Sequence, residues 1–221
     1  MIGRLLLQTM LGLLVATQAW AFDEGIEYTE LARPQATETG DKIEVLELFW
    51  YGCPHCFHLE PTLDQWLEKQ GDNVVFRRMP AILGSHWEPH ARAFYAAELM
   101  EAQDKIHVPL FDAMHVKKRK IMDEDALVAF AVEQGVDGEE FRKAYNSFFV
   151  NMKVRRAVEL GRRFGVDGVP SVIVNGKYRT SPTQTGGSNK MLPVLDYLIE
   201  VESGEVVAGE EAPPAAAGSG S

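Results

Sequence analysis

Cys53 and Cys56 are the only cysteines of the chain, and Pro54 and His55 separate them in the segment "FWYGCPHC". Two cysteines at this spacing can exchange a disulfide with other thiols or contribute to a metal site. A disulfide between them would close a very short loop, and the loop-entropy model gives such a loop the least stabilisation. The pair is therefore better explained by redox chemistry than by a structural cross-link.

A strand and a helix are predicted on either side of the two cysteines. Residues 42–50, "KIEVLELFW", are rich in apolar and β-branched side chains and have the length of a buried strand. Residues 54–71 repeat leucine and tryptophan at helical spacing and end in a glycine. Cys53 is thus expected at the start of a helix, with Pro54 at the first helical position, where its missing N–H costs nothing.

This placement predicts that the two thiols differ. The free amides and the positive end of the helix dipole favour a thiolate at Cys53, and a protonated His55 would add to this effect. Cys56 lies one turn further into the helix and should be less exposed. Such an asymmetric pair suits disulfide exchange, because the outer thiolate attacks or leaves and the inner cysteine resolves the mixed disulfide.

A second segment far along the chain completes the expected sheet. Residues 168–179, "GVPSVIVNGKYR", read as a strand, an Asn-Gly hairpin turn and a second strand. Pro170 opens the first of these strands, where the loss of a donor is tolerated. Residues 188–203 then show helical spacing. Strand, helix with the cysteines, long gap, hairpin and helix is the order of a thioredoxin fold interrupted by an insertion.

The long gap, residues 85–163, contains several helical patterns, with Asp123 or Asp125 as a candidate cap for one of them. The predicted class is α/β, a thioredoxin fold interrupted by an inserted α-helical domain. The expected organisation is a signal peptide at 1–21, thioredoxin-like segments at 22–84 and 164–203, the helical insertion at 85–163, and a disordered tail at 204–221.

The two ends and the overall charge restrict the function classes. Residues 1–21 combine Arg4, a short apolar core and the sequence Ala-Trp-Ala, as in a cleavable secretory signal peptide, and the core is short for a membrane span. The last residues are rich in Ala, Gly, Pro and Glu, a composition typical of disorder. A net charge of −10 argues against nucleic acid as a partner.

The sequence resembles the DsbA family of periplasmic thiol-disulfide oxidoreductases. The resemblance rests on "VLELFWYGCPHC", on "GVP" at 168–170, on "VNGKY" at 174–178 and on a helical block with "VPLFDAM" and "AYNSFFV". It implies a dithiol oxidase that needs no cofactor beyond its redox-active Cys53–Cys56 disulfide. It also implies a cis Pro170 that faces this disulfide.

The resemblance further implies a groove for extended, unfolded polypeptide beside the cysteines. Val169, Pro170 and the aromatic residues Phe49, Trp50 and Tyr51 are the candidates for its apolar rim. The implied partners are newly exported polypeptides as substrates and a DsbB-like membrane quinone reductase for reoxidation. The expected protein is a periplasmic monomer.

Two acidic residues are candidate catalytic groups. Glu47 interrupts a strand that otherwise reads as buried, and burial would raise its pKa; on alternation alone it could instead point outward at a sheet edge. By resemblance, Glu47 relays the proton of Cys56, and Glu60, four residues after Cys56, is a second family acid. The family usually has a lysine on the next strand, where this chain offers Arg77 or Arg78.

Two other functions remain as alternatives. Cys53 and Cys56 followed by His86 and His90 have the ligand types of a Cys2His2 zinc site, with His58 as a further candidate. The 29 residues between Cys56 and His86 exceed the usual spacing of a zinc finger. A disulfide isomerase or reductase of the same fold is the second alternative, although residues 22–41 are too short for the dimerisation domain expected of a periplasmic isomerase.

Overall fold

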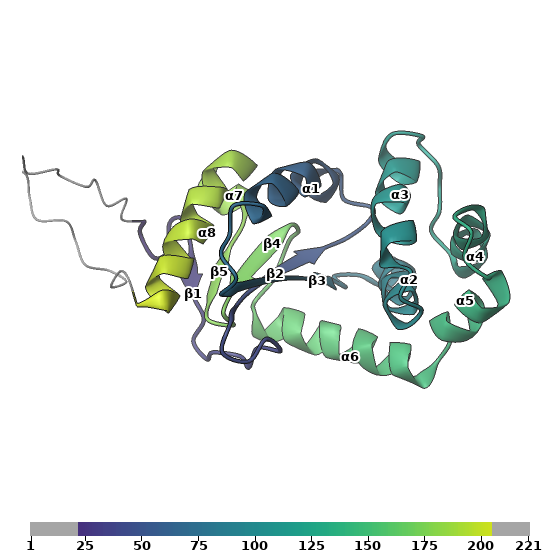
Figure 1. The fold of residues 1–221 in the computed structure, drawn as a ribbon, viewed down its shortest axis with the longest axis horizontal. Helices are drawn as coiled ribbons and strands as arrows, with labels where there is room; N and C mark the ends of the chain where they lie inside the picture. Colours follow the sequence, from purple (N-terminus) through teal and green to yellow (C-terminus); the bar gives the residue numbers. More distant parts are fainter. Residues whose placement is uncertain (1–21, 205–221) are drawn as a thin grey trace, which may run out of the picture.

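The computed structural model describes residues 22–204, and the expected signal peptide and nearly all of the expected tail lie outside this range. A mixed sheet with the strand order β1-β5-β4-β2-β3 forms its centre (Figure 1). The strands are β1 (Thr29–Glu30), β2 (Ile43–Phe49), β3 (Val74–Pro80), β4 (Ser171–Val174) and β5 (Tyr178–Thr180). β2 pairs in parallel with β3 and antiparallel with β4. The predicted strand at 42–50 is therefore confirmed, and it lies inside the sheet.

Helices cover the sheet, and several inserted helices lie together beside it (Figure 1). Those of the sheet half are α1 (Pro54–Leu67), α7 (Pro182–Thr185) and α8 (Ser188–Ser203). Between β3 and β4 lie the 3-10 turn η1 (Ser85–Trp87) and the helices α2 (Glu88–Leu99), α3 (Gln103–His115), α4 (Glu124–Glu133), α5 (Gly138–Tyr145) and α6 (Phe148–Arg163). This arrangement is the predicted α/β fold with a helical insertion.

Two apolar clusters hold these layers together. One packs α1 and α8 against one face of the sheet, and its buried side chains include Val45, Leu63 and Leu195. The other joins the opposite face to the inserted helices through residues such as Leu48 and Phe111. Alternation along β2 sends Val45 to the first cluster and Leu48 to the second. β2 is thus buried on both faces, as its continuous apolar sequence indicates.

The predicted cap of one helix and the predicted hairpin turn are confirmed, whereas the predicted end of another helix is wrong. Asp123, not Asp125, caps α4, because its Oδ1 accepts a hydrogen bond from Ala126 N at 2.9 Å. Asn175 and Gly176 both have a positive φ, at 48° and 65°, and form the turn between β4 and β5. α1 is shorter than expected and ends at Leu67 instead of reaching residue 71.

Among residues 22–204, no helix combines the length and apolarity that crossing a bilayer requires.

Candidate active site

Cys53 is the N-cap of α1, and Pro54 occupies the first turn as predicted. The Cys53 Sγ accepts a hydrogen bond from Cys56 N at 3.4 Å. Its own S–H is directed at the carbonyl oxygen of Val169, also at 3.4 Å. Both cysteines are free thiols, so the structure represents the reduced form. The sulfur of Cys53 therefore lies between the start of α1 and the loop before β4.

The two thiols have opposite electrostatic environments. The pKa of Cys53 is lowered to about 6, mainly because the Cys56 side chain donates a hydrogen bond to its sulfur, with further help from the amides of Cys56 and His55. Cys56 is completely buried, whereas 8% of Cys53 remains exposed. Burial, followed by the hydrogen bond with Cys53 and the charge of Glu47, raises the pKa of Cys56. The predicted asymmetry is present.

His55 contributes less to the Cys53 thiolate than the sequence suggested. Its side chain is exposed, and its charge is the last of the named contributions to the lowered Cys53 pKa. Water screens an exposed charge, whereas a hydrogen bond to the sulfur acts at contact distance. The start of the helix and the neighbouring thiol therefore dominate.

Pro170 lies beside the cysteines, and the Val169–Pro170 peptide bond is cis. The isomer implied by the family resemblance is therefore the one present. The cis bond lies in the loop that brings the carbonyl group of Val169 to the Cys53 sulfur. Val169 itself is partly buried against the apolar cluster of the insertion.

The expected aromatic rim is wrong for two of its three members. Phe49 and Tyr51 are completely buried, and their rings meet edge to face with centroids 5.0 Å apart. Phe111 of α3 packs on both rings. The inserted helices thus cover residues that appear available when only β2 is considered. Trp50 alone remains partly exposed.

Trp50 forms a stacked pair with Trp87, with ring centroids 4.3 Å apart and an interplanar angle of 7°. The indole of Trp50 also covers Gly52, where an added Cβ would approach the Trp50 Cζ2 to 2.3 Å. Gly52 is therefore required for close packing beside the cysteines. The pair joins the loop before α1 to the first turn of the insertion.

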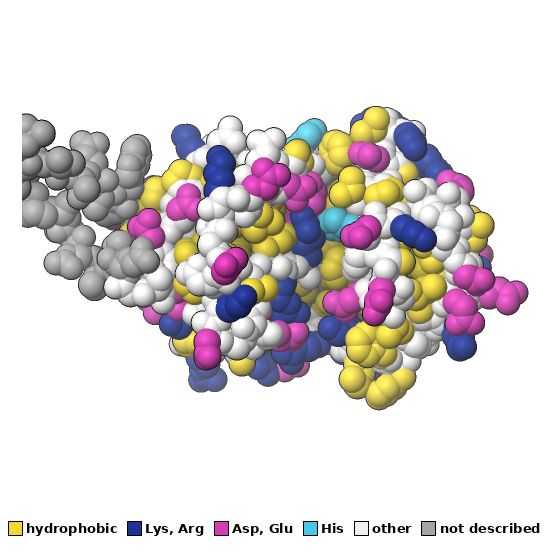
Figure 2. Space-filling model, viewed as in Figure 1, with side chains coloured by type: hydrophobic (Ala, Val, Ile, Leu, Met, Phe, Trp, Pro, Cys, Tyr) yellow, Lys and Arg dark blue, Asp and Glu magenta, His cyan; other side chains and the backbone are white. Residues whose placement is uncertain are grey.

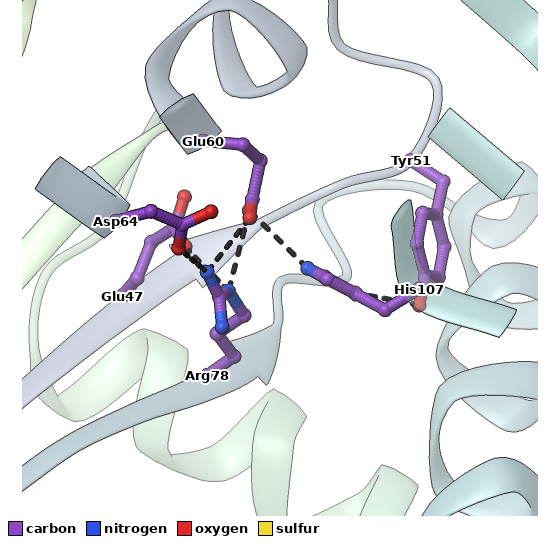
Figure 3. A network of polar contacts seen from close by, with 6 residues as sticks. All are labelled: Glu47, Tyr51, Glu60, Asp64, Arg78 and His107. Atoms are coloured by element: carbon purple, nitrogen blue, oxygen red, sulfur yellow. Dashed lines mark hydrogen bonds and ion pairs between the residues drawn. The ribbon is translucent and has the colours of Figure 1, made fainter. Parts of the chain in front are cut away.

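Six charged and polar side chains form a network (Figure 3), and the charge of one of them, Glu47, acts on Cys56. Arg78 of β3 donates two hydrogen bonds to Glu60 of α1, at 2.7 and 3.2 Å. The same guanidinium lies 3.4 Å from Glu47 and 3.4 Å from Asp64. Arg78, and not Arg77, therefore occupies the basic position left open by the sequence. Arg77 instead pairs with two other acids, Glu38 and Glu44.

Glu47 is a fully buried carboxyl group at one end of this network, where Arg78 is its ion-pair partner. It points inward from β2, so the alternative of an outward-facing residue at a sheet edge is wrong. Neither carboxyl oxygen has a hydrogen-bond partner among the described residues. Burial and the nearby charge of Glu60 raise the pKa of Glu47 well above its ordinary value, although Arg78 opposes them. A group of this kind can hold a proton at neutral pH.

Glu60 is the opposite case, because it is charged although it is buried. Burial acts to raise its pKa, but hydrogen bonds and charges from His107 and Arg78 lower it overall. His107 Nε2 lies 3.2 Å from Glu60 Oε1, and His107 Nδ1 lies 2.9 Å from the hydroxyl oxygen of Tyr51. His107 was not among the site residues predicted from the sequence. A histidine inside the apolar pattern of "IHVPLF" was the available signal.

The histidines considered for a zinc site have other contacts. His90 Nε2 lies 2.6 Å from the carbonyl oxygen of Ile121, and His86 Nε2 accepts a hydrogen bond from Trp87. Within the described range, no three His, Cys, Asp or Glu side chains are placed to share a metal ion.

Comparisons with a family profile and with individual proteins both match this chain to DsbA proteins. The profile of the DSBA-like thioredoxin domain matches residues 44–198. The thiol:disulfide interchange protein DsbA of Pseudomonas aeruginosa is 40% identical over 188 residues, which is 85% of this chain and 89% of that protein. Its counterpart from Burkholderia cepacia is 38% identical over 177 residues, covering 80% and 84% of the two chains.

Solved structures show the same similarity in three dimensions. The crystal structure of Pseudomonas aeruginosa DsbA superposes with a TM-score of 0.78 at 40% identity, covering 83% of this chain and 96% of that one. The oxidoreductase DsbA from Xylella fastidiosa reaches the same TM-score at 29% identity, covering 84% of this chain and all of that one.

Proposed function

The chain belongs to the DSBA-like thioredoxin domain family and is a thiol-disulfide oxidoreductase; from this premise we propose that it oxidises cysteine pairs of newly exported polypeptides through a Cys53–Cys56 disulfide. The observation that carries the proposal is the contrast between the two thiols. Cys53 has a pKa of about 6, whereas burial raises the pKa of Cys56. A low-pKa outer thiol leaves readily, which makes its disulfide a strong oxidant.

The reaction takes two displacements at sulfur. A substrate thiolate attacks Cys53 Sγ, the Cys53–Cys56 bond breaks, and its electron pair leaves on Cys56 Sγ, which then takes up a proton. The second substrate thiolate attacks the substrate sulfur of the mixed disulfide and expels Cys53 as a thiolate. The substrate loses two electrons, and the cysteine pair gains them. The second step benefits most from the environment of Cys53, because that residue is then the leaving group.

Glu47 supplies the proton that Cys56 needs in the first displacement. This assignment is supported by the raised pKa of Glu47, by its complete burial and by the effect of its charge on Cys56. A buried thiolate without a proton source would be costly. In the reverse direction the Glu47 carboxylate accepts the proton of Cys56, so that Cys56 can resolve a mixed disulfide.

We assign substrate binding to the surface formed by Val169 and Trp50, next to the buried Pro170. Its support is the contact of Cys53 Sγ with the Val169 carbonyl group and the partial exposure of Trp50 and Val169. A polypeptide that reaches Cys53 must pass beside these residues. Phe49 and Tyr51 are buried and support this surface from below without contacting the substrate.

Continuous turnover needs an oxidant for the reduced cysteine pair. We assign this role to a DsbB-like membrane protein that passes the two electrons to a quinone, and we assign the protein to the periplasm. Family membership and the signal peptide predicted at 1–21 support both assignments. An oxidising compartment is also where new disulfides persist.

The test is the equilibrium of the purified protein with glutathione, together with oxidation of a reduced two-cysteine peptide by one equivalent of disulfide-form protein. The proposal expects nearly complete transfer to the peptide and a disulfide that glutathione reduces easily. The Cys56→Ala variant, incubated with oxidised glutathione as the disulfide donor, should accumulate as a mixed disulfide at Cys53, with one glutathione thiol released. A pair that stays oxidised in millimolar glutathione and transfers little oxidation would favour the reductase or isomerase alternative.

A further inference from the structure

His107 connects the inserted helices to the carboxylates that surround Arg78 (Figure 3). It lies on α3, and its two ring nitrogens contact Tyr51, in the loop after β2, and Glu60 on α1. The ring is packed edge to face against Phe49 and Phe111. Its orientation is therefore fixed, and both nitrogens are used.

The chain of contacts has one arrangement of protons that satisfies every group. The Tyr51 hydroxyl donates to His107 Nδ1, and His107 Nε2–H donates to the Glu60 carboxylate. Tyr51 is fully buried, and burial with the nearby Glu60 charge raises its pKa, so its O–H proton is retained. His107 therefore holds the Glu60 carboxylate through Nε2 while Tyr51 orients its ring at Nδ1.

Arg78 has to divide its interactions among three carboxyl groups. Two of its hydrogen bonds go to Glu60 and a longer one goes to Asp64 at 3.4 Å. Its contact with Glu47 is also 3.4 Å long, and within residues 22–204 no hydrogen bond reaches either Glu47 oxygen. Glu60 accepts both of these shorter hydrogen bonds because His107 fixes its carboxylate from the other side. Glu47 is left with only a partial ion pair.

Other charged groups also face His107. Asp64 of α1, Arg77 of β3, Glu98 of α2 and Asp104 of α3 line, with Glu60, Arg78 and His107, a cavity of about 360 Å³. Figure 2 shows acidic, basic and histidine side chains together along the boundary between the sheet and the helices α2 and α3. Water in this cavity screens the outer charges more than those of buried Glu60 and Glu47.

We propose that His107 is a positioning residue of the disulfide exchange, which holds Glu60 on Arg78 so that Glu47 keeps its proton for Cys56. This inference rests on the relay role proposed for Glu47. Without His107, Arg78 can turn toward Glu47, and Glu60 loses part of what keeps it charged. Both changes favour the ionised form of Glu47.

The experiment follows the pH dependence of one step. A mixed disulfide between Cys53 and glutathione is resolved by Cys56, and stopped-flow release of glutathione is measured from pH 5 to pH 10. The rate should rise with pH as Glu47 ionises and becomes able to accept the Cys56 proton. His107→Leu should move this rise to lower pH by about one unit, as expected when a cation comes closer to a carboxylate. His107→Gln should stay near the wild type, because its amide N–H can still reach Glu60.

Two controls separate the possible failures. The thiolate absorbance of Cys53 should titrate as in the wild type in both His107 variants, since His107 does not contact that sulfur. Glu47→Gln should abolish the rise; if the rise persists, the relay role and this inference both fail. If Glu47→Gln abolishes the rise but His107→Leu leaves it at the wild-type pH, or His107→Gln shifts it equally, the relay stands and the positioning role of His107 is refuted.

A further variant keeps the test valid if His107→Leu does not fold. Tyr51→Phe retains the packed ring and removes only the hydroxyl group that orients the His107 ring. A shift of the rise in resolution rate to lower pH by less than one unit supports the inference. A folded Tyr51→Phe protein with the wild-type profile would refute it in that case.

Discussion

The stability difference between the reduced and oxidised proteins should depend on pH, because only the reduced protein has an ionisable Cys53. Folding lowers the pKa of Cys53 from 9.0 to about 6. An acid with a lowered pKa stabilises the folded state fully above its unfolded pKa, and this contribution is lost as the pH falls through the folded pKa. The reduced protein should therefore gain stability relative to the oxidised protein between about pH 6 and pH 9. DsbA itself is an oxidant with a stabilised reduced form, so this prediction extends a property of the family.

The size of the effect follows from the shift. Three pKa units correspond to about 4 kcal/mol above pH 9 and to about 1.4 kcal/mol at pH 7. The thiolate lies at the surface end of α1, so screening by water makes both figures upper bounds. The disulfide opposes this by restricting the unfolded chain, which for so short a loop contributes about 2 kcal/mol at every pH. With the upper bound, stabilisation of the Cys53 thiolate equals that from the disulfide near pH 7.5, and a smaller thiolate stabilisation moves this point to higher pH. The reduced form should therefore be the more stable one above about pH 8.

Urea denaturation of fully oxidised and fully reduced protein at intervals from pH 5 to pH 8.5 measures this difference. We expect it to be constant below pH 5.5 and then to change by about 1 kcal/mol per pH unit in favour of the reduced form. Glu47→Gln is the control, because Glu47 also titrates and senses the Cys53 charge. A difference that does not change between pH 6 and pH 8 would show that folding does not stabilise the Cys53 thiolate.

Three further predictions concern the surroundings of the cysteines. At pH 6, iodoacetamide should modify Cys53 at least ten times faster than buried Cys56, as measured by mass spectrometry of the reduced protein; equal rates would contradict the pKa contrast. His55→Ala should raise the Cys53 pKa by less than about half a unit, because the exposed His55 charge is screened, and a rise of more than one unit in the absorbance titration would restore His55 as the main cause. Gly52→Ala should destabilise the protein by about 1–3 kcal/mol in urea, because the new methyl group meets the stacked Trp50 ring, and unchanged stability would show that this ring moves freely.

The parts of the site that the sequence predicted are those formed by neighbouring residues. The strand up to Phe49, the helix start at Cys53 and the first-turn position of Pro54 all depend on local spacing and backbone geometry. Burial of Cys56 follows from one further helical turn. The cis form of Pro170 came from the family resemblance, because nothing local in the sequence distinguishes it from a trans proline.

The errors and omissions involve contacts between distant parts of the chain. Phe49 and Tyr51 were expected at a rim because apolar residues next to the cysteines suggest a binding surface, but α3 covers them. The contact between Glu60 and His107 spans 47 positions, and that between Tyr51 and His107 spans 56. Such pairings depend on how the insertion docks, which helical periodicity does not specify.

The two cysteines therefore depend on different parts of the structure. The low pKa of Cys53 arises from its partner thiol and the first amides of α1, so substitutions at positions 52–55 should mainly change how oxidising the disulfide is. Burial is the main reason why the pKa values of Cys56 and Glu47 are raised. Among the described residues, His107 is linked to Glu47 through Glu60 and Arg78. Changes in α3 should therefore alter the rate of proton transfer and its pH dependence while leaving the Cys53 thiolate nearly unchanged. We therefore expect the insertion to affect the kinetics of exchange and the start of α1 to affect its equilibrium.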